Sequence, residues 1–113
     1  MAVEVIKRLG ATTVGLNIDT TLYLVPSNTM TALSCINACN MSASGVSIRI
    51  AHVDGRINEV SAEDYIAYDE LVPARTNIAY QMGICMEAAD TILVRGDGSG
   101  VSFAFQAWGS EVT

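Results

Sequence analysis

The sequence predicts an all-β protein: an antiparallel β-sandwich of seven to eight strands with jelly-roll or immunoglobulin-like topology. Apolar residues recur mostly with a period of two, the pattern of strands whose side chains point alternately to two faces. The apolar segments lie about 8–14 residues apart with turn residues between them, which is typical of β-sandwiches. No segment has the length and period of a helix. Because spacing does not fix topology, a small β-barrel stays as a third alternative.

The first half of the chain predicts four strands. The segment that opens at Val3 is expected to end at Gly10, and the apolar run from Thr20 is expected to end at Pro26, because proline fixes a turn there. The third segment is a strand that is apolar on both faces. The fourth alternates between apolar and polar residues. In order, these strands are residues 3–9, 20–25, 32–39 and 46–53.

The second half also predicts four strands. Residues 56–64 form the longest polar connection, and residues 87–90 fit either a single helical turn or a loop. A sharp turn is expected at Gly96-Asp97-Gly98, just before the last strand, whose alternation is the clearest in the chain. In order, these strands are residues 65–68, 78–84, 92–94 and 101–108.

Length and charge narrow the classes of function. The chain has 113 residues, a mass of 12.0 kDa and 50% apolar residues, which indicates a single folded domain over residues 1–113. Residues 61–113 hold eight acidic and two basic residues, so this half would repel DNA or RNA and no nucleic-acid partner is expected. The apolar runs are far shorter than the roughly 18 residues that span a bilayer, and residues 1–9 lack the apolar segment of a signal peptide. No membrane partner or export signal is therefore expected.

His52 is the only histidine, and a nucleophilic triad would depend on it. We interpret it as a solvent-facing or locally hydrogen-bonded residue at a strand end. Together with His52, the cysteines Cys35, Cys39 and Cys85 make four ligands, but a Cys-x-x-x-Cys pair on a strand lacks the spacing of structural zinc sites. No catalytic residue, metal or cofactor is expected.

The three cysteines are interpreted as small, buried, reduced thiols. On one strand, Cys35 and Cys39 would lie about 13 Å apart, too far for a disulfide. A bridge from Cys85 to either of them stays open.

Other motifs are assigned to ordinary structure. The acidic pairs Glu63-Asp64 and Asp69-Glu70 flank the strand at 65–68, but adjacent strand residues point to opposite faces, so we interpret them as solvated strand ends instead of glycosidase or calcium sites. The tripeptide Arg95-Gly96-Asp97 matches a cell-adhesion motif and is interpreted as part of the predicted turn.

Apolar side chains are expected to remain for a partner. Trp108 falls on the opposite side of the last strand from Phe103 and Phe105, and the chain has more apolar surface than one sandwich buries. This predicts self-association or docking. The candidate contact residues are Trp108, Tyr23, Tyr65 and Tyr68.

Several short motifs together resemble a family of small virion proteins of tailed bacteriophages, including many cyanophages. The likeness runs from about Thr20 to the last residue. The motifs are Leu22-Tyr23-Leu24-Val25-Pro26, residues 34–40 (SCINACN), residues 47–51 (SIRIA), residues 65–69 (YIAYD), Val101-Ser102-Phe103 and residues 108–113 (WGSEVT).

The resemblance implies a non-enzymatic structural role in the virion, in many symmetric copies, with other virion proteins as partners, no cofactor, and assembly in the host bacterial cytoplasm. A capsid decoration (cement) protein is the leading interpretation, and a tail, neck or baseplate component is the alternative. A receptor- or carbohydrate-binding module of a tail fibre, with the same tyrosines and Trp108 stacking on sugars, is the second class of function. A small hydrolase that depends on His52 is the third. Residues 1–19, which no motif covers, are interpreted as an N-terminal extension that contacts a neighbouring subunit.

Overall fold

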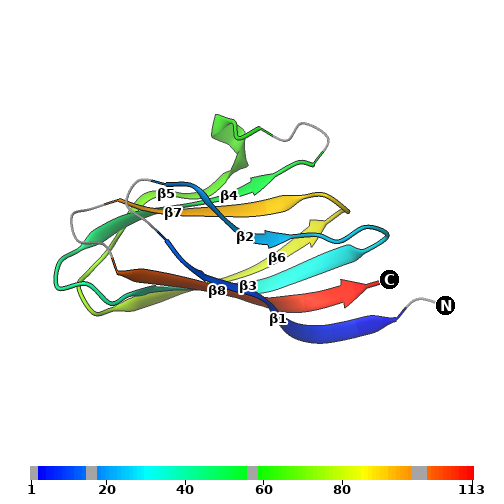
Figure 1. Cartoon of the computed structure of the whole chain (residues 1–113), viewed down its shortest axis with the longest axis horizontal. Coiled ribbons are helices and arrows are strands. Elements are labelled where there is room, and N and C mark those ends of the chain that lie inside the picture. The colour runs from blue at the N-terminus through cyan, green and yellow to red at the C-terminus, as the bar shows by residue number, and fades with distance from the viewer. Residues whose placement is uncertain (1–2, 15–17, 56–58, 98–101) are drawn as a thin grey trace.

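The computed structural model describes residues 3–14, 18–55, 59–97 and 102–113. These residues form eight strands and one short 3-10 helix, and the strands make two four-stranded antiparallel sheets (Figure 1). The elements are β1 (Glu4–Thr13), β2 (Thr20–Leu24), β3 (Met30–Asn40), β4 (Val46–Val53), η1 (Ala62–Asp64), β5 (Tyr65–Val72), β6 (Asn77–Met86), β7 (Thr91–Asp97) and β8 (Phe103–Val112). The predicted all-β sandwich is confirmed.

The strand order gives the sandwich a jelly-roll topology. Sheet A has the order β1-β8-β3-β6 and sheet B has the order β2-β7-β4-β5. The first strand therefore pairs with the eighth, the second with the seventh, the third with the sixth and the fourth with the fifth. A ribbon of eight strands folded in half at the β4–β5 connection and rolled into two layers has this order. Of the three topologies that the sequence left open, the structure has the jelly roll.

The core lies between the two sheets. Phe103 and Phe105 of β8 are fully buried with ring centroids 4.9 Å apart, and they face the aliphatic side chains of sheet B. Alternation explains the layer from sheet B, because every second residue of β4 points inward. The valine, leucine and isoleucine residues of both sheets that are at most 1% exposed are Leu33, Ile36, Val46, Ile48, Ile50, Val72, Ile92 and Val94.

Several predicted strand ends are wrong. The strands predicted to end at residues 68 and 108 run on to Val72 and Val112, so Asp69 and Glu70 lie within β5. Two other errors fall at glycines. β1 does not stop at Gly10 but continues to Thr13, with a shift of register between Arg8 and Gly10. β7 contains Arg95, Gly96 and Asp97, which pair with Arg49, Ile48 and Ser47 of β4. A glycine inside a strand often marks a bulge or a close backbone approach instead of a turn. The rest of the predicted turn, residues 98–101, lies outside the described residues.

Two further segments are placed by the structure. Residues 4–13 of the expected N-terminal extension form β1, which pairs with β8 at the edge of sheet A. Residues 87–90, for which a helical turn or a loop was expected, form a hydrogen-bonded turn in which the Asp90 N–H donates to the Glu87 carbonyl.

Candidate interaction surfaces

The outward side of sheet A is a broad strand surface with few charges. Its residues follow from the register, because they alternate with the buried residues of the same strands. We call this set the A-face. It comprises Glu4, Ile6, Arg8, Ala11 and Thr13 of β1; Ala104, Gln106, Trp108, Ser110 and Val112 of β8; Met30, Ala32, Cys35, Asn37 and Cys39 of β3; and Asn77, Ala79, Gln81 and Cys85 of β6.

Trp108 lies in the middle of the A-face. It pairs with Arg8 on one side and with Cys35 on the other, and Cys35 pairs in turn with Gln81. The prediction that Trp108 points away from Phe103 and Phe105 is confirmed: its side chain is 37% exposed while both phenylalanines are buried. The face also exposes Ile6 and Met30, 83% and 60% accessible.

All three cysteines lie on the A-face, and all are free. Cys85 is exposed, and Cys35 and Cys39 are half-buried, so the expectation of buried thiols is wrong for Cys85. Cys39 pairs with Asn77, about 26 Å along β6 from Cys85 at the usual rise per residue, so those two thiols do not meet. Cys85 pairs with Ala32, which keeps its sulfur at a separate position from Cys35.

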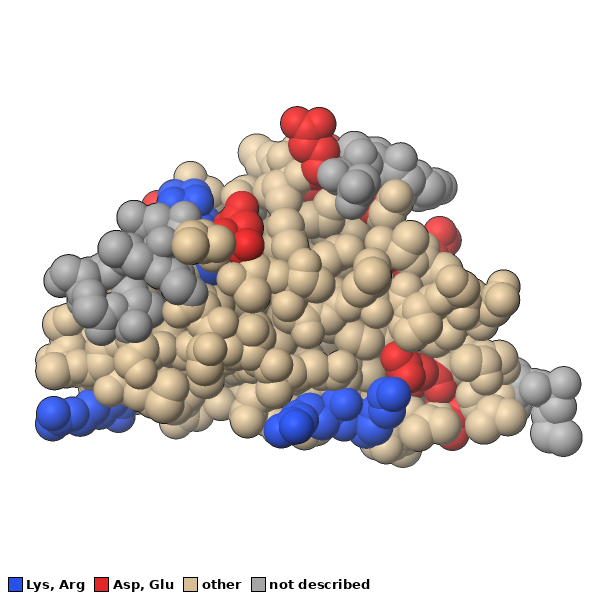
Figure 2. All heavy atoms as spheres, viewed as in Figure 1, with Lys and Arg blue, Asp and Glu red and all other residues tan. Residues whose placement is uncertain are grey.

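The outward side of sheet B carries paired charges. Arg49 Nε lies 2.7 Å from Asp69 Oδ1, and Arg95 Nε lies 2.8 Å from Asp97 Oδ1. The hydrogen bond from Arg49 lowers the pKa of Asp69 from its usual value. The side view in Figure 2 shows acidic groups above the upper layer near η1 and basic groups over β1 in the lower layer. The two outer faces of the sandwich therefore differ in chemistry.

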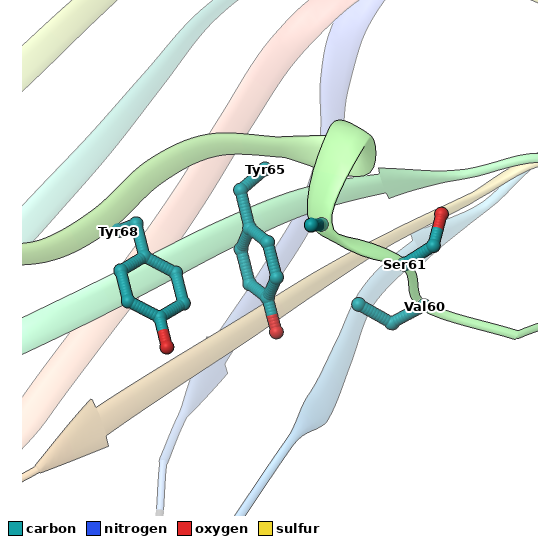
Figure 3. Close-up of a pocket in the computed structure, with 5 residues that line it drawn as sticks. Val60, Ser61, Tyr65 and Tyr68 are labelled. Carbon is teal, nitrogen blue, oxygen red and sulfur yellow. The ribbon is translucent and has the colours of Figure 1, made fainter.

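A pocket of about 470 Å³ lies beside β5 (Figure 3). Tyr65 and Tyr68 point to the same side of β5 and meet edge to face, with ring centroids 4.8 Å apart, and Val60, Ser61 and Ala62 complete the wall. The Arg49 guanidinium lies 4.2 Å from the centre of the Tyr68 ring. The structure thus brings together two of the four predicted contact residues.

Tyr23, the fourth predicted contact residue, packs into the core instead and is 6% exposed. Its hydroxyl donates to the Glu111 carboxylate and lies 2.7 Å from the Thr31 hydroxyl. Burial first, and then the hydrogen bond with Glu111, raise the pKa of Tyr23 to about 12. The Lys7 ammonium, 2.8 Å from Glu111, and the Tyr23 hydroxyl lower the pKa of Glu111. Tyr23 therefore joins the sheets and is not accessible to a partner.

His52 lies at the rim of the sandwich, where its Nε2 is 3.1 Å from Asp90 Oδ2. The same carboxylate accepts hydrogen bonds from the backbone N–H groups of Gly55 at 2.9 Å and Glu87 at 3.1 Å. The expectation of a locally hydrogen-bonded imidazole is confirmed. Within residues 3–14, 18–55, 59–97 and 102–113, no group of three or more His, Cys, Asp or Glu side chains is arranged to hold a metal ion.

The sequence did not predict the A-face as one surface; of its residues, only Trp108 was predicted to contact a partner. Alternation placed Trp108 opposite Phe103 and Phe105, but the cysteines were expected to be buried, and the strand order that brings them onto the same face as Trp108 was not available from spacing. In the same described part of the chain, no helix has the length and apolar character needed to cross a bilayer.

Comparison with known proteins shows the fold alone. No known protein family and no curated protein matches the chain. A chain of the T13 particle of infectious bursal disease virus is similar in structure, with a TM-score of 0.52 and 8% identity over 99% of this chain. Chains of the Gx and Gt strains of the same virus give TM-scores of 0.45 and 0.47 with 11% and 8% identity, over 99% and 98% of this chain. This chain spans 30–31% of the length of these three chains. The first of these matches shows that the same jelly-roll arrangement occurs in a much longer chain.

Proposed function

We propose that this chain is a non-enzymatic structural protein of a virus particle that binds other particle subunits and further copies of itself. The observation that carries the proposal is the jelly-roll fold, which nearly the whole chain shares with part of a chain from a virus particle. The A-face supports it, because a charge-poor sheet with an exposed tryptophan suits contact between subunits.

Within that role, we propose a capsid decoration protein of a tailed bacteriophage, with a tail, neck or baseplate component as the alternative location. The motif resemblance described above supports the phage assignment. The free thiols of Cys35, Cys39 and Cys85 fit assembly in a reducing bacterial cytoplasm. Because none of the three cysteines forms a disulfide, the fold does not depend on an oxidising environment.

Immunogold labelling of purified particles with an antibody to this chain tests the proposal. Gold over the head of each particle supports decoration, and gold confined to the tail supports the alternative location. Particles that carry no label, while denatured particles also lack the chain in an immunoblot, would overturn the structural role.

A second candidate function, carbohydrate binding, is favoured by the pocket at Tyr65 and Tyr68. Exposed aromatic rings next to a guanidinium give a sugar both a stacking surface and a hydrogen-bond donor. Tyr68 is 57% exposed, and Arg49 is held beside it by Asp69.

A glycan array with the isolated protein separates the two functions. Binding that Tyr68→Ala removes and Trp108→Ala keeps would favour the carbohydrate module. Trp108 is the matched control, because it is an exposed aromatic side chain on the other sheet. Absence of binding to any glycan, together with labelled particles, would leave the structural role.

A further inference from the structure

The A-face covers one whole side of the molecule, yet its charge is nearly zero. It carries one acidic and one basic residue, Glu4 and Arg8, both on the edge strand β1. The chain as a whole has a net charge of −6, so the acidic excess lies elsewhere. Two copies that meet through any acidic surface repel each other, whereas two A-faces do not.

The residues around Trp108 are mostly small or uncharged. Cys35, Ala32 and Ser110 are examples, and Arg8, the partner of Trp108 on β1, is a charged neighbour. Ile6 and Met30 add exposed apolar side chains in the next rows toward the end of the face. A hollow at that end is lined by apolar atoms of Met30, Ala32, Cys85 and Val112, together with Thr31. Protein interfaces commonly have such an arrangement at their centre: a large aromatic side chain packs among smaller ones, and water is excluded.

We propose that the A-face is a two-fold interface between two copies of this chain, centred on Trp108. The proposal deepens the structural role above and rests on it, because it names a second copy as the partner of this face. In such a pair the same residues of both copies meet, as in other isologous dimers. The two A-faces pack as the sheets of a sandwich do, and the apolar side chains of both copies are removed from water.

The size of the A-face suits a dimer. It spans four strands, of which the longest has 11 residues and the others 10 each. With the usual strand spacing and rise per residue it covers about 600 Å² per copy, or roughly 1,200 Å² for the pair, the lower limit of specific interfaces. A second copy fits this face better than a basic partner does, because the face offers a basic partner no cluster of acidic groups.

Sedimentation velocity of the full chain over about 1–100 µM tests the interface. We expect a monomer–dimer equilibrium that Trp108→Glu weakens at least tenfold, because the substitution places two like charges face to face. Gln106→Glu, which adds a charge on the same face with almost no change of shape, is expected to do the same and covers the case that Trp108→Glu fails to fold. Leu71→Glu is the matched control, because Leu71 is 62% exposed on a strand of sheet B.

Thiol alkylation gives an independent readout on the same samples. In the dimer, Cys35, Cys39 and Cys85 are expected to react more slowly as the concentration rises, and the two charged variants are expected to remove this dependence. A chain that stays monomeric to 100 µM, or a dimer that both charged variants leave intact, would overturn the proposal. If the purified chain is monomeric but its thiols are protected in assembled particles, another protein covers the A-face: the dimer is then wrong and the structural role stands.

Discussion

The side-chain amide of Asn40 donates a 2.9 Å hydrogen bond to the buried carbonyl of Val72, which ties the last residue of β3 in sheet A to the last residue of β5 in sheet B. The same nitrogen lies 3.0 Å from the Ser44 carbonyl and 3.1 Å from the Pro73 carbonyl, and Asn40 Oδ1 accepts from the Ser42 N–H at 2.8 Å. Asn40 is only 1% exposed. One buried amide therefore holds two loops at this end of the sandwich.

Asn40→Ala is expected to lower the free energy of unfolding by about 2–4 kcal/mol, because it removes the hydrogen bonds that the Asn40 side chain makes with buried backbone groups. Urea denaturation followed by far-ultraviolet circular dichroism measures the change. Asn37→Ala is the matched control on the same strand. The side-chain oxygen of Asn37 accepts a hydrogen bond from the Asn77 amide in an exposed position, so losing this bond is expected to cost less than about 1 kcal/mol. Equal losses for the two variants would contradict the role of Asn40.

Asp90 is expected to make stability depend on pH. Burial acts to raise its pKa, but the Gly55 N–H, His52 and the Glu87 N–H together hold the pKa below its usual value. Because the pKa in the folded state lies below that of the unfolded chain, the carboxylate stabilises the fold above its ordinary pKa of about 4. This contribution is lost as the pH falls through the folded-state pKa.

Asp90→Asn is therefore expected to lower the free energy of unfolding by about 1–3 kcal/mol at pH 7, and the difference from the unsubstituted chain is expected to shrink near pH 3. Urea denaturation at both pH values measures it. Glu63→Gln, an exposed acidic residue of η1, is the control and is expected to change stability little at either pH. A constant difference between pH 7 and pH 3 would show that the charge of Asp90 is not what matters.

The sequence predicts a strand well where the alternation within that single strand is enough to identify its buried face. Val46, Ile48 and Ile50 alternate with polar residues, and that alternation alone places β4 between a core and an outer face. It predicts strand ends less well, because pairing with another strand determines where a strand stops. Gly10 and Gly96 were predicted to end strands, and both lie within strands. At Gly10 the register with β8 shifts, and at Gly96 the strand pairs regularly with β4; in both places the contacts are with a distant strand and leave no local signal.

The candidate surfaces show the same limit. Tyr23 follows Leu22 directly, and strict alternation would place one of them outside, yet both are buried because the β2–β7 register shifts between Thr21 and Tyr23. Trp108 and Cys35 share a row of the A-face although they are far apart in sequence. Only the strand order of the jelly roll brings them together, and periodicity does not determine strand order.

Tyr23 is expected to ionise late in an alkaline titration. Its folded-state pKa of about 12 lies above the ordinary value near 10, so the neutral phenol stabilises the fold fully below about pH 10 and that contribution is lost as the pH rises toward 12. Absorbance at the phenolate band, compared between the unsubstituted chain and Tyr23→Phe, isolates this residue from the other tyrosines. A difference spectrum that titrates near pH 10 would contradict the buried hydrogen bond.

Tyr23→Phe is also expected to lower the free energy of unfolding at pH 7 by about 1–2 kcal/mol, because Glu111 and Thr31 lose a partner between the sheets. Tyr68→Phe is the matched control, since Tyr68 is 57% exposed. Its hydroxyl loss is expected to have an effect within about 0.5 kcal/mol. Guanidinium denaturation at pH 7 compares the two.

Gly109 and Gly83 test the packing of the strand backbones of sheet A. A Cβ atom on Gly109 would lie 2.2 Å from the carbonyl oxygen of Ala32, where β3 and β8 shift register, whereas a Cβ on Gly83 of β6 would meet no atom within 4 Å. Gly109→Ala is therefore expected to cost about 3 kcal/mol or more, because backbone atoms have to move. Gly83→Ala is expected to be neutral or to stabilise by up to about 1 kcal/mol, since alanine restricts the unfolded chain. Thermal unfolding measures both, and a Gly109→Ala variant as stable as Gly83→Ala would show that β3 and β8 do not approach each other this closely.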